Sequence, residues 1–411
     1  MSHMSAQRAL VTVEEHQSRV AALIGLLPVV ELPTDDCLGM VLARDLSTSI
    51  PLPPFDNSAM DGYAVRAADL AGASRATPVE LPVVEDIPAG RIDVVPLVPG
   101  TAHRIMTGAP LPPGADAVVQ VELTDAGTAR VRLYAEVSAG THLRLAGEDV
   151  EAGAVVLAAG TALGPFQLGL AAATGAPALP VYRRPRVLVL STGSELVAPG
   201  QPLRPGQIYE SNGTMLAAAV RSVGGEPELL RFVPDDVAQF HAALDERVAG
   251  ADLVITSGGV SAGAYEVVKD ALSGRGVTFY RVAMQPGGPQ GAGRYLGVPV
   301  VTLPGNPVSA AISFEIFVRP ALLVAAGHRL ADRSRPRATL LADVSAPAGR
   351  RQYRRGWYSP DQGVVGPVGG PGSHLLASLS KANCLFVVPE ETTEIRAGGE
   401  VEVIPLAELA G

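Results

Sequence analysis

RVLVLSTGSEL, residues 186–196, is an unbroken apolar run that ends in a cluster of small and polar residues. Such a run is typical of a strand that is buried on both faces of a parallel sheet. The pattern recurs at residues 252–263 (DLVITSGGVSAG) and 298–309 (VPVVTLPGNPVS), and a helical pattern follows each time. The chain therefore predicts a parallel sheet with helices on both faces, and ligands of such sheets bind at the carboxyl ends of the strands.

The segments on either side of this sheet domain, which we place at residues 181–328, have different patterns. Residues 1–50 and 144–180 are predicted to form one discontinuous mixed domain at the N-terminus. Residues 51–143 are rich in Pro, Gly and Val, with short alternating runs, and predict a β-rich inserted domain. Short strands with Gly and Pro turns predict a separate small β domain at residues 329–411. The predicted fold class is thus a multidomain α/β protein.

Composition excludes several classes of protein. A net charge of -9 over 411 residues argues against a nucleic-acid binder, whose footprint is a basic face. Cys37 and Cys384 make no disulfide framework, no Cys and His cluster has zinc-ligand spacing, and no apolar run approaches the length of a membrane span. The N-terminus does not read as a signal peptide, so we expect a soluble cytosolic protein. Because Lys269 and Lys381 are the only lysines, a site that needs a cation must use one of them, Arg or a metal.

Three strand-to-helix loops of the sheet domain carry the residues expected to bind a ligand. Each offers backbone N–H groups and hydroxyls at the positive end of a helix, and glycine lets a phosphate approach the backbone closely. These candidate residues are Ser191, Thr192, Gly193, Ser257, Gly258, Gly259, Ser261, Pro304, Gly305, Asn306, Pro307 and Ser309. One such loop alone could be a plain turn, but three in one sheet favour a ligand that bears phosphate. None is a P-loop or a dinucleotide-binding fingerprint.

Carboxylates lie close to these loops. Glu195, Asp235 and Glu266 all fall at or just after predicted strand ends. Carboxylates beside phosphates repel them unless a hard divalent cation bridges the two, and oxygen ligands combined with substrate phosphates describe a magnesium site. Alternatively, Glu195 and Asp235 are first-turn residues that the helix dipole favours.

Three further stretches combine stiffness with polar groups. Residues 51–66, PLPPFDNSAMDGYAVR, predict a rigid loop that carries carboxylates and amides, or else a proline-rich connector. Residues 284–289, MQPGGP, form a stiff turn around Pro286 after a predicted strand. Residues 349–356 hold four arginines within six positions, which suits an oxyanion or, equally, a solvated basic turn.

Several of these stretches resemble the molybdopterin molybdenumtransferases, the bacterial relatives of the E domain of gephyrin. The matching stretches are PLPPFDNSAMDGYAVR, RIMTGAPLPPGADAVV (104–119), LSTGSELVAPG (190–200), PGQIYESN (205–212), ITSGGVSAG (255–263), LPGNPVSA (303–310) and SLSKAN (378–383). They occur in family order and span nearly the whole chain.

The resemblance implies an elongated homodimer of four-domain subunits, with a molybdopterin-binding-like sheet domain and a C-terminal small β barrel. It implies a cytoplasmic transferase of molybdenum cofactor biosynthesis that inserts molybdenum from molybdate into adenylylated molybdopterin and releases AMP. Magnesium or another divalent cation would assist, and contact with the molybdopterin adenylyltransferase is a further expectation. A non-catalytic molybdopterin-binding paralogue and a scaffold are the alternatives.

The resemblance also assigns expected roles. Asp61 and Thr107 belong to loops that would reach the active site, either of their own subunit or of the partner subunit. Glu195 and Asp235 match positions near the nucleotide phosphates and the metal. The catalytic candidates are Asp61, Thr107, Glu195, Asp235 and Glu266.

Other matched positions are expected to bind substrate. Ser261 and Glu266 match the family's GGVSxGxxD region, where Glu266 replaces the family's Asp. Ser309 matches a pterin or molybdate pocket, and Arg350 and Ser378 match candidates for molybdate contact.

One departure from the family concerns charge. Gln285 and Gly288 occupy positions where many members have Lys, and a neutral amide does not replace an ammonium as a counter-charge. We expect Lys269 and the cluster around Arg350 to compensate.

Overall fold

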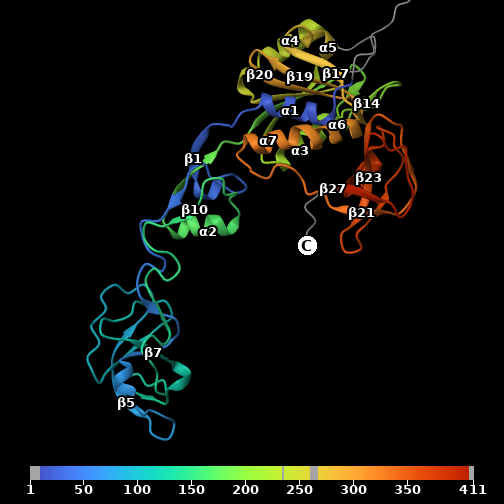
Figure 1. The fold of residues 1–411 in the computed structure, drawn as a ribbon. Coiled ribbons are helices and arrows are strands. Elements are labelled where there is room, and N and C mark those ends of the chain that lie inside the picture. Colours follow the sequence, from blue (N-terminus) through green and yellow to red (C-terminus); the bar gives the residue numbers. More distant parts are fainter. Residues whose placement is uncertain (1–9, 234–235, 260–266, 407–411) are drawn as a thin grey trace, which may run out of the picture.

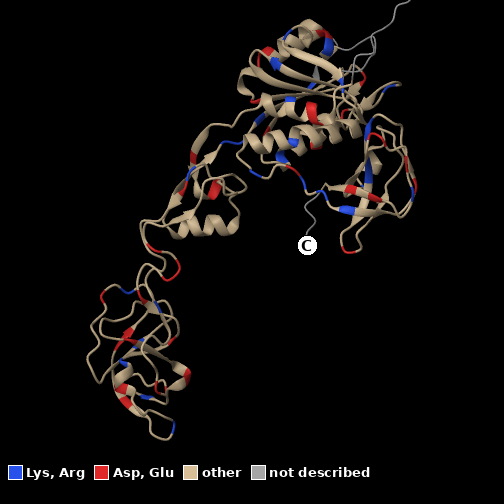
Figure 2. Ribbon diagram, viewed as in Figure 1, with Lys and Arg blue, Asp and Glu red and all other residues tan. Residues whose placement is uncertain are grey.

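The computed structural model describes residues 10–233, 236–259 and 267–406, which form an elongated chain of four parts (Figure 1). A sheet domain and a small β barrel lie at one end, and the β-rich inserted domain lies at the other end. A small mixed domain connects them. Figure 2 shows acidic and basic residues interspersed along all four parts, so local groups set the charge at any one site.

The sheet domain is built on a six-stranded sheet in the order β15-β12-β16-β20-β19-β17. Its strands are β12 (Arg186–Thr192), β15 (Glu226–Val233), β16 (Leu253–Ser257), β17 (Val277–Arg281), β19 (Pro289–Tyr295) and β20 (Val298–Leu303). β15, β12, β16 and β20 run parallel, which confirms the predicted parallel sheet. β19 and β17 add an antiparallel edge, because Leu296 and Gly297 form a two-residue turn with positive φ angles of 48° and 86°.

Helices cover both faces of this sheet, as predicted. They are α1 (Val13–Leu23), α3 (Asn212–Ser222), α4 (Val237–Asp245), α5 (Val267–Leu272), α6 (Pro307–Ser313) and α7 (Arg319–Ala325), with the 3-10 turn η4 (Val248–Gly250) after α4. α1, α3, α6 and α7 share one apolar core with the sheet, and α4 and α5 share a second core on the opposite face. α1 begins at a capping box, in which Thr12 Oγ1 accepts from Glu15 N at 3.1 Å and Glu15 Oε2 accepts from Thr12 N at 3.0 Å.

A single π turn, η5 (Phe314–Val318), joins α6 to α7 in one continuous helix. The helix Pro307–Ala325 has 19 residues and is long and apolar enough to cross a membrane. The expectation that no apolar run reaches this length was therefore wrong. However, 72% of its most apolar window is buried inside the protein, and a core helix meets the same criteria, so the finding is weak evidence for a membrane span.

The small mixed domain contains short paired strands and one helix. Its elements are β1 (Val29–Pro33), η1 (Thr34–Asp36), β2 (Leu46–Ser47), β10 (Val155–Leu157), α2 (Pro165–Ala173) and β11 (Ala178–Tyr182). β1 pairs with β11 and β10 pairs with β2, both antiparallel, so the two distant segments of the chain meet in one domain. Cys37 is buried here and Cys384 is buried in the barrel, and both are free.

The inserted domain is a curled five-stranded sheet in the order β7-β4-β6-β5-β8. Its elements are β3 (Asn57–Ser58), β4 (Gly62–Val65), η2 (Ala67–Leu70), β5 (Val79–Ile87), β6 (Ala102–Ile105), β7 (Ala117–Gln120), η3 (Val121–Leu123), β8 (Arg130–Leu133) and β9 (Leu143–Arg144). β3 pairs with β9 where the domain leaves and rejoins the small mixed domain.

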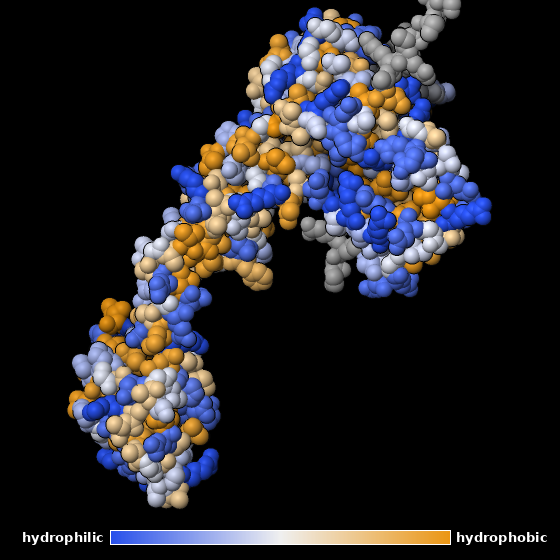
Figure 3. Space-filling view, viewed as in Figure 1, coloured by the Kyte–Doolittle hydropathy of each residue, from blue (hydrophilic) through white to orange (hydrophobic). Residues whose placement is uncertain are grey.

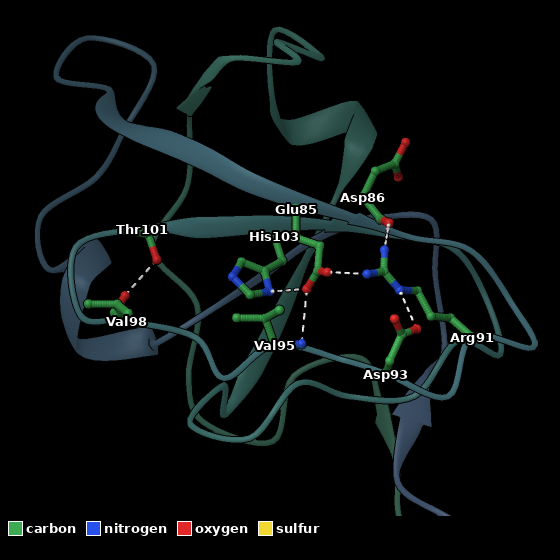
Figure 4. A network of polar contacts seen from close by, with 8 residues as sticks. All are labelled: Glu85, Asp86, Arg91, Asp93, Val95, Val98, Thr101 and His103. Carbon is green, nitrogen blue, oxygen red and sulfur yellow. Dashed lines mark hydrogen bonds and ion pairs between the residues drawn. The ribbon is translucent and has the colours of Figure 1, made fainter.

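A polar network fastens the long loop between β5 and β6 to this sheet (Figure 4). The Glu85 carboxylate accepts from Val95 N at 3.1 Å, pairs with Arg91 Nη2 at 2.5 Å and lies 3.7 Å from His103 Nδ1. Asp93 lies 3.1 Å from Arg91 Nε and extends the network. Burial lowers the pKa of His103, so this histidine is neutral at pH 7 and the cluster serves the fold of the loop.

The C-terminal part is a closed barrel, which confirms the predicted small β barrel. Its strands β21 (Arg337–Leu340), β23 (Arg351–Ser359), β24 (Val364–Pro367), β25 (Cys384–Val388) and β27 (Glu400–Pro405) follow the order β23-β24-β21-β27-β25, and β25 pairs back with β23. The minor elements are β22 (Val344–Ser345), α8 (Leu376–Leu379) and β26 (Glu394–Ile395). β18 (Met284–Gln285) leaves the sheet domain and pairs in parallel with β23. This pairing fixes the turn around Pro286 between the two domains.

Candidate functional site

Two cavities adjoin where the parallel strands end and the barrel packs against the sheet domain. The outer cavity has a volume of about 690 Å³ and the inner cavity about 440 Å³. The loops after β12, β16 and β20 converge on the outer cavity, and Gly305, Asn306 and His374 line both. The arrangement follows from the parallel topology, which brings the carboxyl ends of β12, β16 and β20 to one edge.

Asn212, the first residue of α3, ties two of these loops together. Its Nδ2 donates to Ser257 Oγ at 2.8 Å and to the carbonyl of Gly305 at 2.6 Å. Its Oδ1 is buried and accepts no hydrogen bond. The side chain therefore fixes the loops after β16 and β20 relative to each other and leaves one acceptor unpaired at the cavity.

Glu210 anchors the remaining loop. Its carboxylate is buried, and Oε1 accepts from Ser191 Oγ at 2.9 Å and from Gly213 N at 2.5 Å. Its Oε2 has no hydrogen-bond partner and lies 3.8 Å from Arg231 Nε. Gly213 is required here, because a Cβ atom at that position would lie 2.6 Å from Ser191 Oγ. Ser191 donates its proton to Glu210, so its hydroxyl offers lone pairs to a ligand.

Glu195 lines the outer cavity from the short ribbon of β13 (Leu196–Val197) and β14 (Ile208–Tyr209). Its carboxylate folds back over the loop, since a Cβ atom on Gly193 would lie 2.7 Å from Glu195 Oε2. The φ angle of Gly193, +151°, also lies in the region that favours glycine. The outer cavity thus holds backbone N–H groups, hydroxyls and two carboxylates.

The inner cavity is built by the turn around Pro286 and by the start of α6. Gln290 fixes this turn: its buried Nε2 donates to the carbonyl of Gly287 at 2.8 Å and to Ser313 Oγ at 2.6 Å. Gln285 and Ser309 contribute side chains to the lining, which is otherwise rich in proline and glycine.

The far wall of the inner cavity is a loop of the barrel, residues 371–374. Val308 N donates to the carbonyl of Ser373 at 3.1 Å, and Asn306 Nδ2 donates to Ser373 Oγ at 2.9 Å. From behind, Arg355 donates to the carbonyls of Gly370 and Gly372. The loop is therefore held from both sides, and it carries His374 into the wall that both cavities share.

Most of the predicted loop residues meet in this place. The outer cavity is lined by Ser191, Thr192, Gly193, Glu195, Ser257, Gly258, Gly259, Gly305, Asn306 and Pro307, and the inner cavity by Pro286, Pro304 and Ser309. Lys269, Arg350 and Ser378 line neither cavity. The predicted candidates Asp235, Ser261 and Glu266 lie outside the described residues.

Asp61 and Thr107 meet each other but not the cavities. Thr107 N and Thr107 Oγ1 each donate to Asp61 Oδ1 at 2.7 Å. These hydrogen bonds, the backbone one foremost, lower the pKa of Asp61 and keep it ionised. Both residues belong to the inserted domain, at the far end of the chain from the two cavities (Figure 1).

Sequence reasoning missed four lining residues with clear geometry: Glu210, Asn212, Ser373 and His374. Glu210 and Asn212 lie in PGQIYESN, a stretch that served only as a family motif. This stretch lies directly before a predicted helix, where carboxylates and amides accept hydrogen bonds from the first helix N–H groups. Glu210 could have been predicted from that position. Ser373 and His374 reach the site only through packing of the barrel on α6.

The three family models that match describe consecutive parts of the chain. The MoeA N-terminal region (domain I and II) matches residues 11–175, a probable molybdopterin binding domain matches 188–324, and the MoeA C-terminal region (domain IV) matches 337–406. Molybdopterin molybdenumtransferase 2 of Mycobacterium tuberculosis is 53% identical over 95% of this chain and 98% of its own length. Molybdopterin molybdenumtransferase 1 of the same organism is 38% identical over 97% and 99%. The crystal structure of the molybdopterin biosynthesis MoeA protein from Pyrococcus horikosii superposes with a TM-score of 0.82 at 34% identity, covering 97% of this chain and 100% of that one.

Proposed function

The chain belongs to the MoeA family of molybdopterin molybdenumtransferases, transferases of molybdenum cofactor biosynthesis, and we propose that it inserts molybdenum from molybdate into adenylylated molybdopterin. The observation that carries this proposal is the pair of adjoining cavities. The outer one is lined by the Ser and Gly loops at the strand ends, and the smaller inner one by neutral polar groups and His374. A nucleotide-bearing substrate in the outer cavity places its pterin end beside an oxyanion in the inner one.

The proposed chemistry balances without a redox partner. Water attacks a phosphorus of the phosphoanhydride, the bridging P–O bond breaks, and AMP leaves. Molybdate binds the two dithiolene sulfurs and loses one oxo group, which leaves as water with the two thiol protons. The protein contributes positioning and electrostatic stabilisation. Backbone N–H groups and the Ser257 and Asn306 side chains orient the phosphates.

The donors at the outer cavity fit a divalent cation such as Mg²⁺. Glu195 and Glu210 line it, and Glu210 Oε2 and Asn212 Oδ1 are buried oxygens without hydrogen-bond partners. Hard oxygen donors of this kind suit Mg²⁺, which usually keeps waters and binds substrate phosphates as well. Within the described ranges, no group of three or more His, Cys, Asp or Glu side chains gathers to hold a metal ion. The cation would therefore bind together with the phosphates of the substrate. Asp235, which the sequence predicted as a ligand, lies outside the described residues.

We propose a homodimer in which the partner subunit completes the site. The ionised Asp61 accepts two hydrogen bonds from Thr107, yet both residues belong to the inserted domain, which lies far from the cavities of the same chain (Figure 1). A second copy placed antiparallel could bring them to the outer cavity. Figure 3 shows apolar surface over the small mixed domain and the adjoining part of the sheet domain. Large apolar side chains are exposed in this part of the chain, since Leu26, Phe166 and Leu330 are 64%, 86% and 91% exposed. Such a surface is typical of an interface.

The proposal places the protein in the cytoplasm, where it would take adenylylated molybdopterin from the molybdopterin adenylyltransferase by direct contact. The test is AMP release. Purified protein is mixed with adenylylated molybdopterin and Mg²⁺, and AMP is measured with and without molybdate. The account expects release in wild type and strong loss in Glu195→Gln. Binding of the substrate without AMP release would instead indicate a non-catalytic paralogue.

A further inference from the structure

The described residues that line the inner cavity include no charged side chain apart from one histidine. Among the described residues that line it, Gln285, Asn306, Ser309 and Ser373 are neutral, and the remainder are proline and glycine except His374. An oxyanion in such a cavity receives hydrogen bonds but no counter-charge from Lys or Arg. His374 is the one lining side chain of the described chain that can carry positive charge.

The position of His374 is fixed by its loop. The loop is held by Val308 N at 3.1 Å from the Ser373 carbonyl and by Arg355 Nη1 at 3.0 Å from the Gly372 carbonyl. The imidazole packs over Gly372, where a Cβ atom would lie 3.0 Å from His374 Cε1. His374 is exposed to solvent, so both of its ring nitrogens can reach a ligand without disturbing the core.

We propose that His374 binds the oxyanion in the inner cavity and makes its affinity depend on pH. This proposal rests on the proposed function, since the oxyanion is taken to be molybdate. Histidine side chains change charge between pH 5 and 8, and the protonated ring donates two hydrogen bonds and attracts a dianion. Among the described residues, the charged groups around it are Glu195 and Glu210 in the outer cavity and Arg355 behind the loop. Arg355 donates its hydrogen bonds to backbone carbonyl groups, and the two glutamates repel an anion. The charge on His374 therefore decides whether the surroundings of the inner cavity attract the oxyanion.

The test measures molybdate binding by calorimetry at pH 6.5 and pH 8.5. Wild type is expected to bind more tightly at the lower pH. His374→Gln is expected to bind on the order of tenfold more weakly at pH 6.5, the size of a lost hydrogen bond to a charged group, and to lose the pH dependence. Lys381→Gln, an exposed lysine of the same domain, is the matched control for loss of positive charge and should bind like wild type.

A second variant tests whether charge is the cause. Gln285→Lys in the His374→Gln background puts a permanent charge into the same cavity and should restore binding at both pH values. Wild-type affinity and pH dependence in His374→Gln would overturn this inference and leave the proposed function standing. Absence of molybdate binding in wild type at both pH values would instead overturn the oxyanion step of the proposed function, and this inference with it.

Discussion

Replacing Asn212 by alanine tests whether the loops at the outer cavity must be held together before the ligand binds. The substitution removes the hydrogen bonds at 2.8 Å to Ser257 Oγ and at 2.6 Å to the Gly305 carbonyl. A typical net contribution is about 1 kcal/mol for each, so the two together are worth about 2 kcal/mol. If the ligand must reorder these loops, nucleotide affinity should fall roughly thirtyfold.

The assay is calorimetric titration of ADP in the presence of Mg²⁺, with thermal unfolding recorded for each variant. Gln239→Ala, an exposed amide on α4 at the opposite face of the sheet, is the matched control and should bind like wild type. The reasoning is refuted if Asn212→Ala binds ADP within about twofold of wild type, since ordering of the loops would then contribute nothing to affinity.

Three other outcomes are expected. Burial lowers the pKa of His16 to about 4, so the stability it contributes is present above its unfolded pKa of 6.5 and lost as pH falls towards 4. Between pH 7 and pH 4.5 this loss amounts to about 2.5 kcal/mol in wild type, and urea unfolding at these two pH values should show that it is missing in His16→Gln. Arg183→Ala removes the two hydrogen bonds, at 2.7 and 2.8 Å, that the guanidinium donates to the Asp252 carboxylate. The free energy of unfolding should fall by about 2 kcal/mol, and an unchanged melting temperature would contradict a stabilising role of this pair. Mixing inactive Asp61→Ala with inactive Glu195→Ala should restore about a quarter of wild-type AMP release if subunits exchange and share sites, and no recovery would contradict sharing.

The strand-end loops could be predicted because their signal is local. Continuous apolar runs followed by Ser and Gly mark β12 and β16, and parallel pairing brings such ends together wherever they lie in sequence. Ser191, Ser257 and Asn306 accordingly line one cavity. The C-terminal barrel could also be predicted, because short strands separated by Gly and Pro turns are typical of such a domain.

The parts that could not be predicted depend on contacts between distant segments. The wall that carries His374 exists because Ser373 bonds to the start of α6, which is about 65 residues earlier in the chain. Arg350 was chosen from a dense run of arginines, but it is Arg355 that reaches the loop of the cavity. Alternation along β23 places Arg355 on the face of Tyr353, opposite the barrel core that contains Tyr358. The antiparallel edge of the sheet depends on a short turn at Gly297, and the strand before this turn, β19, gave no clear pattern in the sequence.

The most direct test of the central claim is a crystal structure of the protein with ADP, Mg²⁺ and molybdate. The account predicts phosphate density between the loops of Ser191, Ser257 and Asn306, a cation near Glu195, and a tetrahedral oxyanion in the inner cavity beside Ser309. Nucleotide bound elsewhere on the protein, with both cavities filled only by water at saturating ligand, would contradict it.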